Sequence, residues 1–180
     1  MAHLTVSVEY GLHCLLWLVD AGDTPLSSRD LAELQGISPS FVAKIFPKLE
    51  KAGIVVACEG VRGGYRLACP PEQISVLRVV DAIEGEKPLF DCQEVRSRCA
   101  LFEDKPPQWA TSGTCGIHGV MLKAEKAMRD ELATHSLASI AAGFSHKIPE
   151  TFVVEVRDWT QLRAENRKPG RRPKTPEPPP

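Results

Sequence analysis

Residues 28–67 constrain the fold more than any other part of the chain. Ser28 is placed to cap a short helix that runs to Gln35, and Gly36 is placed to end it. Ser38 and Pro39 then predict the start of a second helix, because serine caps a helix well and proline fits its first turn. The chain is therefore predicted to form two helices joined by a very short turn.

The second helix has one apolar face and one polar face. Its inward positions are Phe41, Val42, Ile45, Phe46 and Leu49, and its other face shows Ser38, Ser40, Lys44 and Lys48. A β-branched run over 54–59, a glycine-rich turn and a short return at 65–67 predict a hairpin directly afterwards. Helix, short turn, helix and hairpin together predict a winged helix-turn-helix, in a fold that is mainly α with a small β-wing.

The remaining chain shows further helical patterns and one strand-like run. We expect helices over 6–19, 76–84 and 117–132 and a helical turn over 136–140, whereas residues 86–116 lack a sustained period. The β-branched run 151–156 is interpreted as a terminal strand. From residue 164 the chain is rich in proline and basic residues, which predicts disorder.

Composition leaves several classes of protein open and disfavours others. A net charge of -1 does not exclude DNA binding, because DNA responds to a local basic patch rather than to the total charge. We expect a cytoplasmic protein with no membrane partner, since the sequence shows neither a secretory signal nor a membrane-spanning apolar run. Without a phosphate-binding loop or a nucleophile motif, we expect no enzyme. Six cysteines then indicate metal or redox chemistry.

The winged helix-turn-helix predicts a double-stranded DNA operator as the partner. Hydroxyl groups at the start of the second helix are placed to bond bases or phosphates, and basic groups there and in the wing are placed to neutralise phosphates. The candidate DNA contacts are Arg29, Ser38, Ser40, Phe41, Lys44, Lys48, Arg62 and Arg66. The alternative is a winged helix that contacts proteins, together with the proline-rich tail.

Three stretches of the sequence resemble the Rrf-type transcriptional regulators. They are the run from Asp30 to Phe41, the run from Leu49 to Ile54 and the Gly-Gly-Tyr-Arg-Leu sequence at 63–67. This family includes the iron–sulfur-cluster assembly regulator and repressors that sense nitric oxide or redox state. The resemblance covers about residues 4–140 and implies a homodimer in which a long C-terminal helix pairs with its mate.

The resemblance sets the expected division of the chain. We expect a DNA-binding domain over 1–85, a cysteine-bearing cluster loop over 86–116, a dimerisation helix region over 117–145, a C-terminal segment over 146–163 and a disordered tail over 164–180.

Cys92, Cys99 and Cys115 are the candidate thiolate ligands. They lie in a segment otherwise poor in core residues, and thiolates are soft ligands that suit iron–sulfur clusters and zinc. Many members of the resembled family hold an iron–sulfur cluster with three cysteines in this segment. Cys14 is interpreted instead as a small core residue, since it lies in an apolar helix.

Glu9 and His13 are the candidate ligands that are not cysteines. They are four residues apart on a predicted helix and therefore share a face. The run 8–14 resembles redox-sensing members that ligate a [2Fe-2S] cluster with Cys, Glu and His, where the first helix of one subunit faces the cysteine loop of the other. We favour Glu9 and His13 with Cys99 and Cys115. Cys92 is a substitute, and so is His118, because Cys115-Gly-Ile-His118 matches the assembly regulator.

These residues predict a repressor whose operator affinity depends on the redox state or integrity of an iron–sulfur cluster. A [2Fe-2S] cluster is favoured, and a [4Fe-4S] cluster is the alternative, since the nitric-oxide sensors have an acidic residue at the position of Glu9. Tyr10 lies beside Glu9 and is placed to respond to a change of charge there. A second alternative is a regulator without a cluster, in which the cysteines bind zinc or act as reactive thiols.

Overall fold

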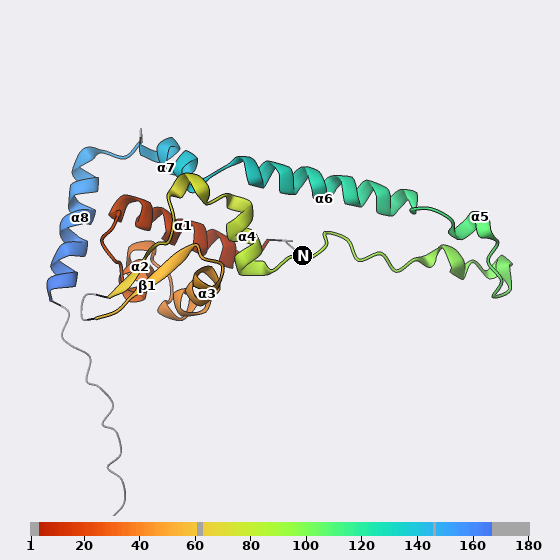
Figure 1. Cartoon of the computed structure of the whole chain (residues 1–180), viewed down its shortest axis with the longest axis horizontal. Coiled ribbons are helices and arrows are strands. Elements are labelled where there is room, and N and C mark those ends of the chain that lie inside the picture. The colour runs from red at the N-terminus through yellow and green to blue at the C-terminus, as the bar shows by residue number, and fades with distance from the viewer. Residues whose placement is uncertain (1–3, 61–62, 146, 167–180) are drawn as a thin grey trace, which may run out of the picture.

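A helical body, built from both ends of the chain, carries a long arm on one side (Figure 1). The computed structural model describes residues 4–60, 63–145 and 147–166. The first four helices and a two-stranded sheet form most of the body, and two helices from the C-terminal part of the chain complete it. The architecture predicted from the sequence, mainly α with a small β-wing, is confirmed.

Helix α1 (Val6–Ala21) forms the centre of the body. Its side chains at Cys14, Leu15 and Leu18 are buried. Gly11 lies where α1 meets two other helices, because a Cβ atom at this position would come within 2.5 Å of Ile83 Cδ1 and 3.5 Å of Ile45 Cγ2. The glycine therefore lets α1 pack closely on both neighbours.

The helix-turn-helix consists of α2 (Ser28–Gln35) and α3 (Pro39–Lys51). The N-cap of α2 is Ser27 rather than Ser28, because the Ser27 hydroxyl and the Asp30 carboxylate form a reciprocal capping box. Gly36 ends α2 in the left-handed conformation (φ 66°), and Ser38 caps α3 ahead of Pro39. The start of α2 was thus wrong by one residue, whereas the start of α3 is confirmed.

Strands β1 (Val55–Cys58) and β2 (Gly64–Leu67) pair antiparallel to form the wing, in a register that runs from Val55 opposite Leu67 to Cys58 opposite Gly64. Residues 61 and 62, at the turn, lie outside the described part of the chain. The wing is joined to the start of α2 because Leu26 and Tyr65 exchange two backbone hydrogen bonds of 3.0 and 2.8 Å. A Cβ atom at Gly64 would lie 2.4 Å from the Leu26 carbonyl oxygen, so this approach requires glycine.

A short 3-10 helix η1 (Pro71–Gln73) leads to α4 (Val76–Glu84), which has the predicted bounds and is capped by Ser75. Helix α7 (Leu137–Ser145) packs against α1 and is longer than the single turn expected from the sequence. Ser75 and Ser136 form an antiparallel bridge, so the segment before α7 is joined to the segment before α4. Leu137 is fully buried in the core that results.

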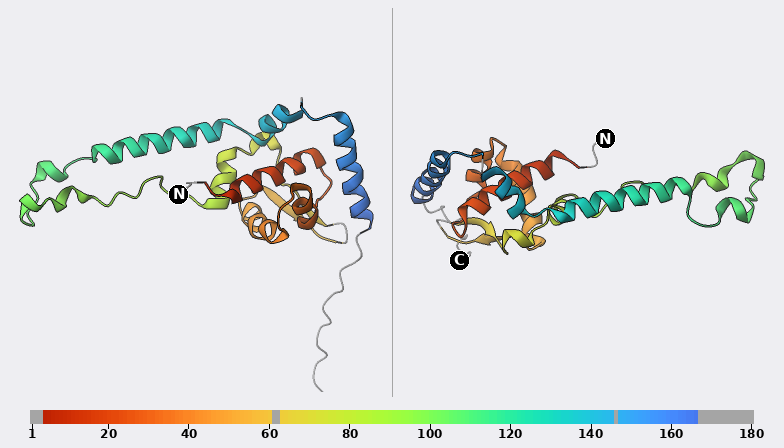
Figure 2. Two further views of the ribbon diagram at one scale, coloured as in Figure 1. Left: turned by 180° about the vertical axis from the view of Figure 1, so that it is seen from behind. Right: turned by 90° about the horizontal axis from the view of Figure 1, so that it is seen from above.

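The arm consists of α6 (Gly116–Thr134) and the segment 86–115, which runs beside it (Figures 1 and 2). This segment contains only short helical pieces: η2 (Val95–Arg98), η3 (Ala100–Phe102) and α5 (Gln108–Thr111). The base of α6 is fixed to α4 by a bidentate ion pair in which Arg129 donates to Asp81 at 2.8 and 2.9 Å. None of the residues of α6 is buried.

Helix α8 (Glu150–Glu165) covers the side of the body opposite the arm (Figure 1). The terminal strand expected over 151–156 is therefore wrong. Phe152, Val156 and Thr160 lie three or four residues apart and line a cavity of about 380 Å³ next to Trp17 of α1. The β-branched residues favour a strand locally, but the segment lies in a helix whose last turn is fixed to α2 by ion pairs of Arg163 with Asp30 and Glu33. The disorder predicted from residue 164 is wrong at its start, since residues 164 and 165 belong to α8; residues 167–180 lie outside the described part.

In the described part of the chain, no helix combines the length and the apolar character that crossing a bilayer requires.

Candidate functional site

The N-terminal end of α3 presents small polar groups to solvent. Ser38 and Ser40 are exposed, and their hydroxyl oxygens lie 2.8 Å apart. The Ser38 oxygen also accepts a hydrogen bond from the Ser40 amide at 3.3 Å, which is the N-cap contact. Lys44 is exposed one helical turn further along. This end of α3 therefore offers two hydroxyl groups and one ammonium group to a ligand.

Other predicted DNA contacts have roles inside the protein. The Lys48 ammonium group donates to the Ile83 carbonyl at 2.6 Å and so joins α3 to the C-terminal end of α4. Phe41 is half-buried, and its ring lies edge-on to Tyr10 with the centroids 5.2 Å apart. Arg66 is half-buried in the wing and donates to the Leu67 carbonyl at 3.2 Å. We infer that Lys48 and Phe41 stabilise the position of α3.

Of the remaining two predicted DNA contacts, the structure describes one. Arg29 is exposed in the first turn of α2. Arg62 lies outside the described residues, at the turn of the wing.

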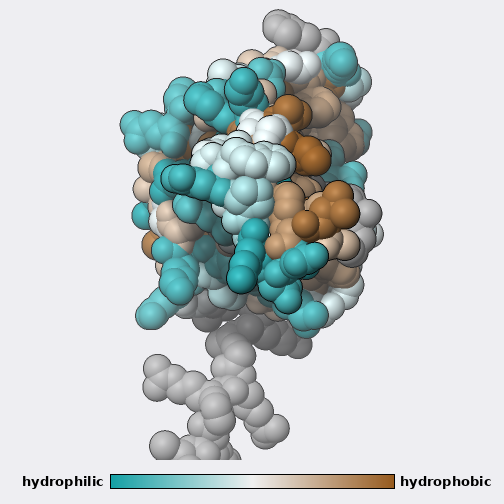
Figure 3. Space-filling model, turned by 90° about the vertical axis from the view of Figure 1, so that its right-hand side faces the viewer, coloured by the Kyte–Doolittle hydropathy of each residue, from teal (hydrophilic) through white to brown (hydrophobic). Residues whose placement is uncertain are grey.

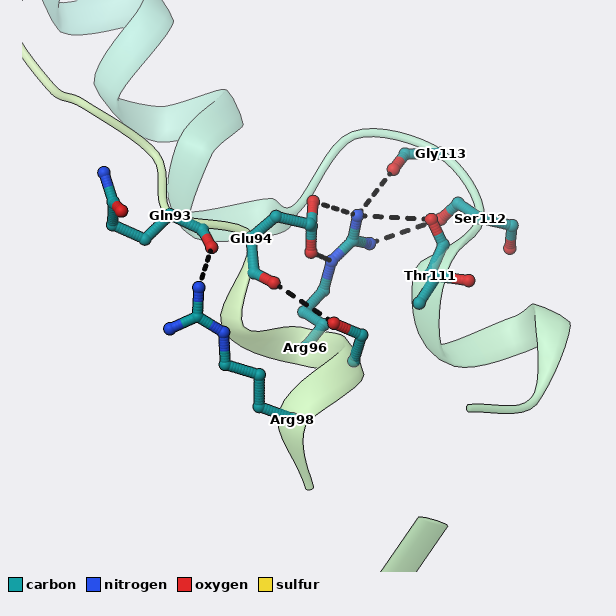
Figure 4. Close-up of polar contacts among 8 residues, drawn as sticks. Gln93, Glu94, Arg96, Arg98, Thr111, Ser112 and Gly113 are labelled. Carbon is teal, nitrogen blue, oxygen red and sulfur yellow. Dashed lines mark hydrogen bonds and ion pairs between the residues drawn. The ribbon is translucent and has the colours of Figure 1, made fainter. Parts of the chain in front are cut away.

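Arg96 holds together the two chain segments of the arm that carry the cysteines (Figure 4). Its guanidinium donates to the Glu94 carboxylate at 2.6 and 2.8 Å and to three consecutive carbonyls, those of Thr111, Ser112 and Gly113, at 3.0–3.3 Å. Sequence reasoning missed this residue. The only signal in the sequence was the Glu94-Val95-Arg96 pattern between two cysteines, which does not show that the arginine binds a segment about fifteen residues away.

Cys92 and Cys115 lie beside this guanidinium. The hydrogen-bonded carboxylate of Glu94 raises the pKa of Arg96, and the nearby thiol groups of Cys115 and Cys92 raise it further when they are charged. Both cysteines are half-buried. Cys99, between η2 and η3, is exposed instead. Cys92 and Cys115, from opposite ends of the cysteine segment, thus both act electrostatically on Arg96.

His118 faces the same part of the arm. Its ring lies 6.2 Å from the ring of Phe90, centroid to centroid, and its charge contributes to a lowered pKa of Glu94, for which the hydrogen bond from Arg96 is the largest cause. Within the described part of one chain, however, Cys92, Cys115 and His118 are not grouped closely enough to hold a metal ion, so the ligand role of His118 stays a prediction.

Glu9 and His13 lie on the body, not on the arm. They line a shallow groove with apolar side chains of α1 and α7, namely Leu12, Leu16, Ile140 and Phe144. Glu9 is exposed and His13 is half-buried. Within residues 4–60, 63–145 and 147–166 of one chain, no three Cys, His, Asp or Glu side chains are grouped closely enough to hold a metal ion. One chain by itself therefore does not join Glu9 and His13 to the cysteines.

The other cysteines belong to the body. Cys14 is 1% exposed, and burial raises the pKa of its thiol to about 12. It is therefore a neutral core residue at neutral pH, as the sequence indicates. Cys69 accepts a weak hydrogen bond from Arg78 at 3.6 Å, and Cys58 lies half-buried on β1.

Comparison with known proteins identifies relatives along most of the chain. Residues 4–143 match the model of the Rrf2 family, described as iron-dependent transcriptional regulators. The protein Rrf2 of Nitratidesulfovibrio vulgaris is 36% identical over 138 residues, which is 76% of this chain and 85% of that protein. The regulator IscR of Aliivibrio salmonicida is 37% identical over 89 residues, about half of each chain. The regulator NsrR of Bacillus licheniformis is 28% identical over 144 residues, which is 79% of this chain and 94% of NsrR.

Solved structures share the fold. The cysteine regulator CymR of B. subtilis superposes with a TM-score of 0.62 at 20% identity, over 79% of this chain and 98% of CymR. IscR of T. potens gives the same TM-score at 24% identity, over 83% of this chain and 93% of its own. The winged helix and the arm are thus a known arrangement, and the matches in sequence cover both. The chain belongs to the Rrf2 family of transcriptional regulators.

Proposed function

We propose that the protein is a homodimeric, cytoplasmic transcriptional repressor that binds a DNA operator. We expect it to have no catalytic activity. Its operator affinity is set by the redox state or integrity of an iron–sulfur cluster held between the two subunits. The observation that carries this proposal is the separation of two incomplete ligand sets on one chain: Glu9 and His13 on the body, and Cys92 and Cys115 on the arm.

Exposed apolar side chains on α6 and at the far end of the arm support a dimer. Ile117, Val120 and Leu122 are 65%, 63% and 48% exposed, and Leu101 and Trp109 near the far end of the arm are 88% and 75% exposed. Apolar atoms gather between polar ones on the side of the molecule that carries the arm (Figure 3). Exposed apolar surface of this extent is typical of an interface.

Pairing of two α6 helices also joins the two ligand sets. The arm projects from one side of the body (Figure 1), so two antiparallel α6 helices would lay the arm of each subunit along the body of the other. The cysteines of one chain would then lie near the α1 groove of its partner. Each dimer would hold two such sites, because the interface is the same on both subunits.

The donor atoms fit a [2Fe-2S] cluster. Two half-buried thiols, one carboxylate and one imidazole supply four ligands, and soft thiolates with an imidazole are ligands that such clusters accept. We favour Cys92 over Cys99 here, because Cys92 is half-buried like Cys115 and both act electrostatically on Arg96, whereas Cys99 is exposed; this changes the ligand set preferred from the sequence. Cys99 and His118 remain the substitutes, and a [4Fe-4S] cluster remains the alternative. The family description as iron-dependent supports iron over zinc.

A bound cluster supplies a change of charge when it gains or loses an electron. Tyr10 follows Glu9 directly, and its ring contacts Phe41 at the start of α3. A movement of Glu9 would therefore shift Tyr10 against Phe41 and change how Ser38 and Ser40 are presented. The regulator responds only if DNA binds one of the two arrangements better, and a coupling of about 1–3 kcal/mol is typical.

Anaerobic purification tests the cluster and its ligands. We expect a coloured protein with equal iron and sulfide, and loss of the visible absorption in Glu9→Ala, His13→Ala, Cys92→Ala and Cys115→Ala. Cys58→Ala is the matched control, since Cys58 is also half-buried but lies on β1, and it should keep the spectrum. Loss of the spectrum in Cys99→Ala or His118→Ala, with Cys92→Ala unchanged, would overturn the ligand set.

Operator binding tests the regulation. The operator is first selected by the whole protein from a pool of random duplexes, and affinity is then measured for oxidised, reduced and cluster-free protein. We expect at least a fivefold difference between two of these states. Equal affinity in all three would leave a DNA-binding protein without the proposed control. Colourless protein that contains zinc would instead support the zinc alternative.

A further inference from the structure

We propose that the cavity between α1 and α8 binds a small effector, an amine carried on an aromatic body, and that the bound amine changes operator affinity. The cavity is lined by other residues than the groove and the arm proposed to hold the cluster, so it gives the regulator a second input. Only the effect on DNA rests on the operator binding proposed above.

The cavity has the size and the lining of a small-molecule site. Its volume is about 380 Å³, and pockets for small ligands typically have about 300–1,000 Å³. The end of α1 lies against α8 (Figure 1), and the two helices contribute the aromatic rings of Trp17 and Phe152 and the apolar side chain of Val156 to the lining. Leu26 also lines the cavity and is only 2% exposed. This apolar lining with two rings suits a ligand with an aromatic body.

Asp20 supplies an unpaired negative charge at the cavity. It lines the cavity from the last turn of α1, and within the described part of the chain its carboxylate has no hydrogen-bond or ion-pair partner. Although the residue is exposed, partial burial raises the pKa of its carboxyl group, because the charged form has lost some of its water. A cationic ligand group beside Asp20 would restore the lost stabilisation of this charge.

The C-terminal end of α1 strengthens the preference for a cation. Carbonyl groups at this end of a helix carry partial negative charge, which favours a basic residue and disfavours an acidic one. The last turn of α1 contains Asp20 but no basic residue. An ammonium group of the ligand therefore provides the positive charge that this helix end lacks.

The charged residues of α8 do not cancel this preference. Arg157 and Glu165 also line the cavity, and because their charges are opposite, Asp20 leaves an excess of one negative charge. Glu165 accepts a hydrogen bond from Gln161 at 3.1 Å, whereas Asp20 and Arg157 do not pair with each other among the described residues. The lining thus favours an amine over a carboxylate of the same shape.

Two residues of the lining contact the DNA-binding elements directly. The Trp17 indole nitrogen donates to the Gln35 side-chain oxygen at 3.1 Å, and Gln35 is the last residue of α2. Leu26 exchanges two backbone hydrogen bonds with Tyr65 of the wing. A ligand that moves the Trp17 ring or the Leu26 segment therefore also moves α2 or the wing.

Arg163 joins the α8 wall of the cavity to α2 as well. Its guanidinium donates to Asp30 at 2.9 Å and to Glu33 at 2.6 and 2.9 Å. Asp30 is only 3% exposed, so this contact is better protected from solvent than an ordinary surface ion pair. A change in the distance between α1 and α8 would thus reach the helix-turn-helix from both walls.

Three indole compounds of similar size and different charge test the ligand class. Tryptamine is cationic at neutral pH, tryptophol is neutral and indoleacetate is anionic. Each is titrated into the isotope-labelled whole protein, and the indole N–H signals of its three tryptophans are followed by nuclear magnetic resonance. The variants Trp17→Phe, Trp109→Phe and Trp159→Phe assign these signals.

We expect tryptamine to shift the signal of Trp17 and to leave that of Trp109, near the far end of the arm, unchanged. Tryptamine should bind roughly tenfold more tightly than tryptophol, because a hydrogen bond between charged groups is stronger than one to a neutral hydroxyl, and indoleacetate should bind most weakly. An unshifted Trp17 signal at millimolar concentrations of all three compounds would overturn the proposal. Tighter binding of indoleacetate than of tryptamine would overturn the assigned ligand class.

Two variants test the site itself. Asp20→Asn keeps the shape of the side chain and removes its charge, so tryptamine should bind it no more tightly than tryptophol does. Asp158→Asn is the matched control, because Asp158 is an exposed carboxylate on α8 that does not line the cavity, and it should keep the preference for tryptamine. Val156→Trp narrows the cavity and should weaken all three compounds, with the helix content checked by circular dichroism. An unchanged preference in Asp20→Asn would overturn the role of Asp20.

The effect on DNA is measured on an operator selected by the whole protein from random duplexes. Saturating tryptamine should change operator affinity by about fivefold or more in the unchanged protein and not in Asp20→Asn. Equal affinity with and without bound tryptamine would overturn the second input, while the binding site would stand. Failure of the protein to bind any selected duplex would instead overturn the proposed function, and the resonance titration would still decide whether the cavity binds the amine.

Discussion

Gly11 is the residue at which α1, the helix of Glu9 and His13, touches both α3 and α4. A methyl group there would lie 2.5 Å from Ile83 Cδ1, so Gly11→Ala must push the isoleucine side chain or separate the helices. We expect the free energy of unfolding to fall by about 1–3 kcal/mol, the usual cost of overpacking. Urea denaturation at one fixed protein concentration measures this change.

The control for this prediction is Gly143→Ala in α7. No heavy atom lies within 4 Å of a Cβ atom at Gly143, and the residue is exposed inside a helix. Alanine should therefore raise the stability by about 0.5–1 kcal/mol. If Gly11→Ala also proved stabilising, the close packing of α1 on α4 would be wrong.

The six thiol groups should differ widely in reactivity in cluster-free protein. Alkylation requires the thiolate, and burial raises the pKa of Cys14 to about 12, so at pH 8 only about one Cys14 in ten thousand is charged. Cys99 is exposed and should be alkylated first. Mass spectrometry of peptides after a short treatment with iodoacetamide measures the order.

Protein unfolded in urea is the reference for this experiment, because all six cysteines should then react at similar rates. Labelling of Cys14 in the folded protein as fast as Cys99 would show that α1 is not packed as described.

At the scale of elements, the contact between α1 and α3 should transmit the state of the cluster. Tyr10→Ala removes the ring that meets Phe41, whereas Tyr10→Phe keeps the edge-on contact and loses only the hydroxyl. We expect the ratio of operator affinities between oxidised and reduced protein to fall towards one in Tyr10→Ala and to persist in Tyr10→Phe. Visible absorption confirms that both variants retain the cluster.

An unchanged ratio in Tyr10→Ala would show that the coupling runs through other contacts. If oxidised and reduced protein bound the operator equally well in both variants, the coupling would depend on the Tyr10 hydroxyl group and not on the ring contact.

Local chemistry was enough to predict the helix-turn-helix and the wing. Ser38-Pro39 and Gly36 determine where helices begin and end through hydrogen bonds within a few residues, and the structure has them in these roles. The helix α8 was wrongly predicted because its β-branched residues favour a strand locally, while its contacts to the body come from far away in the sequence, such as those of Arg163 with Asp30 and Glu33. Long-range contacts decide such segments, and a single sequence does not contain them.

For the candidate site, the spacing of Glu9 and His13 predicted a shared face, and both line one groove. Their role as metal ligands stays a prediction, and so does the choice among the cysteines. The contact of Arg96 with the carbonyl groups of residues 111–113 was not predictable from the sequence. Polar contacts with main-chain carbonyls leave no pattern in side-chain types.

At the scale of the whole molecule, mixed dimers test whether each cluster site is shared by two chains. One subunit carries Glu9→Ala and His13→Ala, and the other carries Cys92→Ala and Cys115→Ala. In the mixed dimer one site combines both damaged halves and the other combines both intact halves. We therefore expect half the iron of the unchanged dimer, although each double variant alone holds none.

Two affinity tags allow the mixed dimer to be isolated, and iron analysis gives the result. A ligand set contained within one chain would give no iron in the mixed dimer, since each chain lacks part of it. The same experiment with Cys58→Ala in place of the cysteine pair controls for the effect of the tags and should give the mixed dimer one intact site as well.

Because no residue of α6 is buried, the amount of dimeric regulator in a cell would depend steeply on the amount of chain synthesised. In the proposed dimer, the part of α6 beyond its base on α4 would gain its packing from a second copy, so assembly and stability would both depend on protein concentration. When chains are scarce, the number of pairs rises with the square of the number of chains. Halving synthesis would then remove about three quarters of the functional pairs, which gives promoter control a steeper response than a monomer would have.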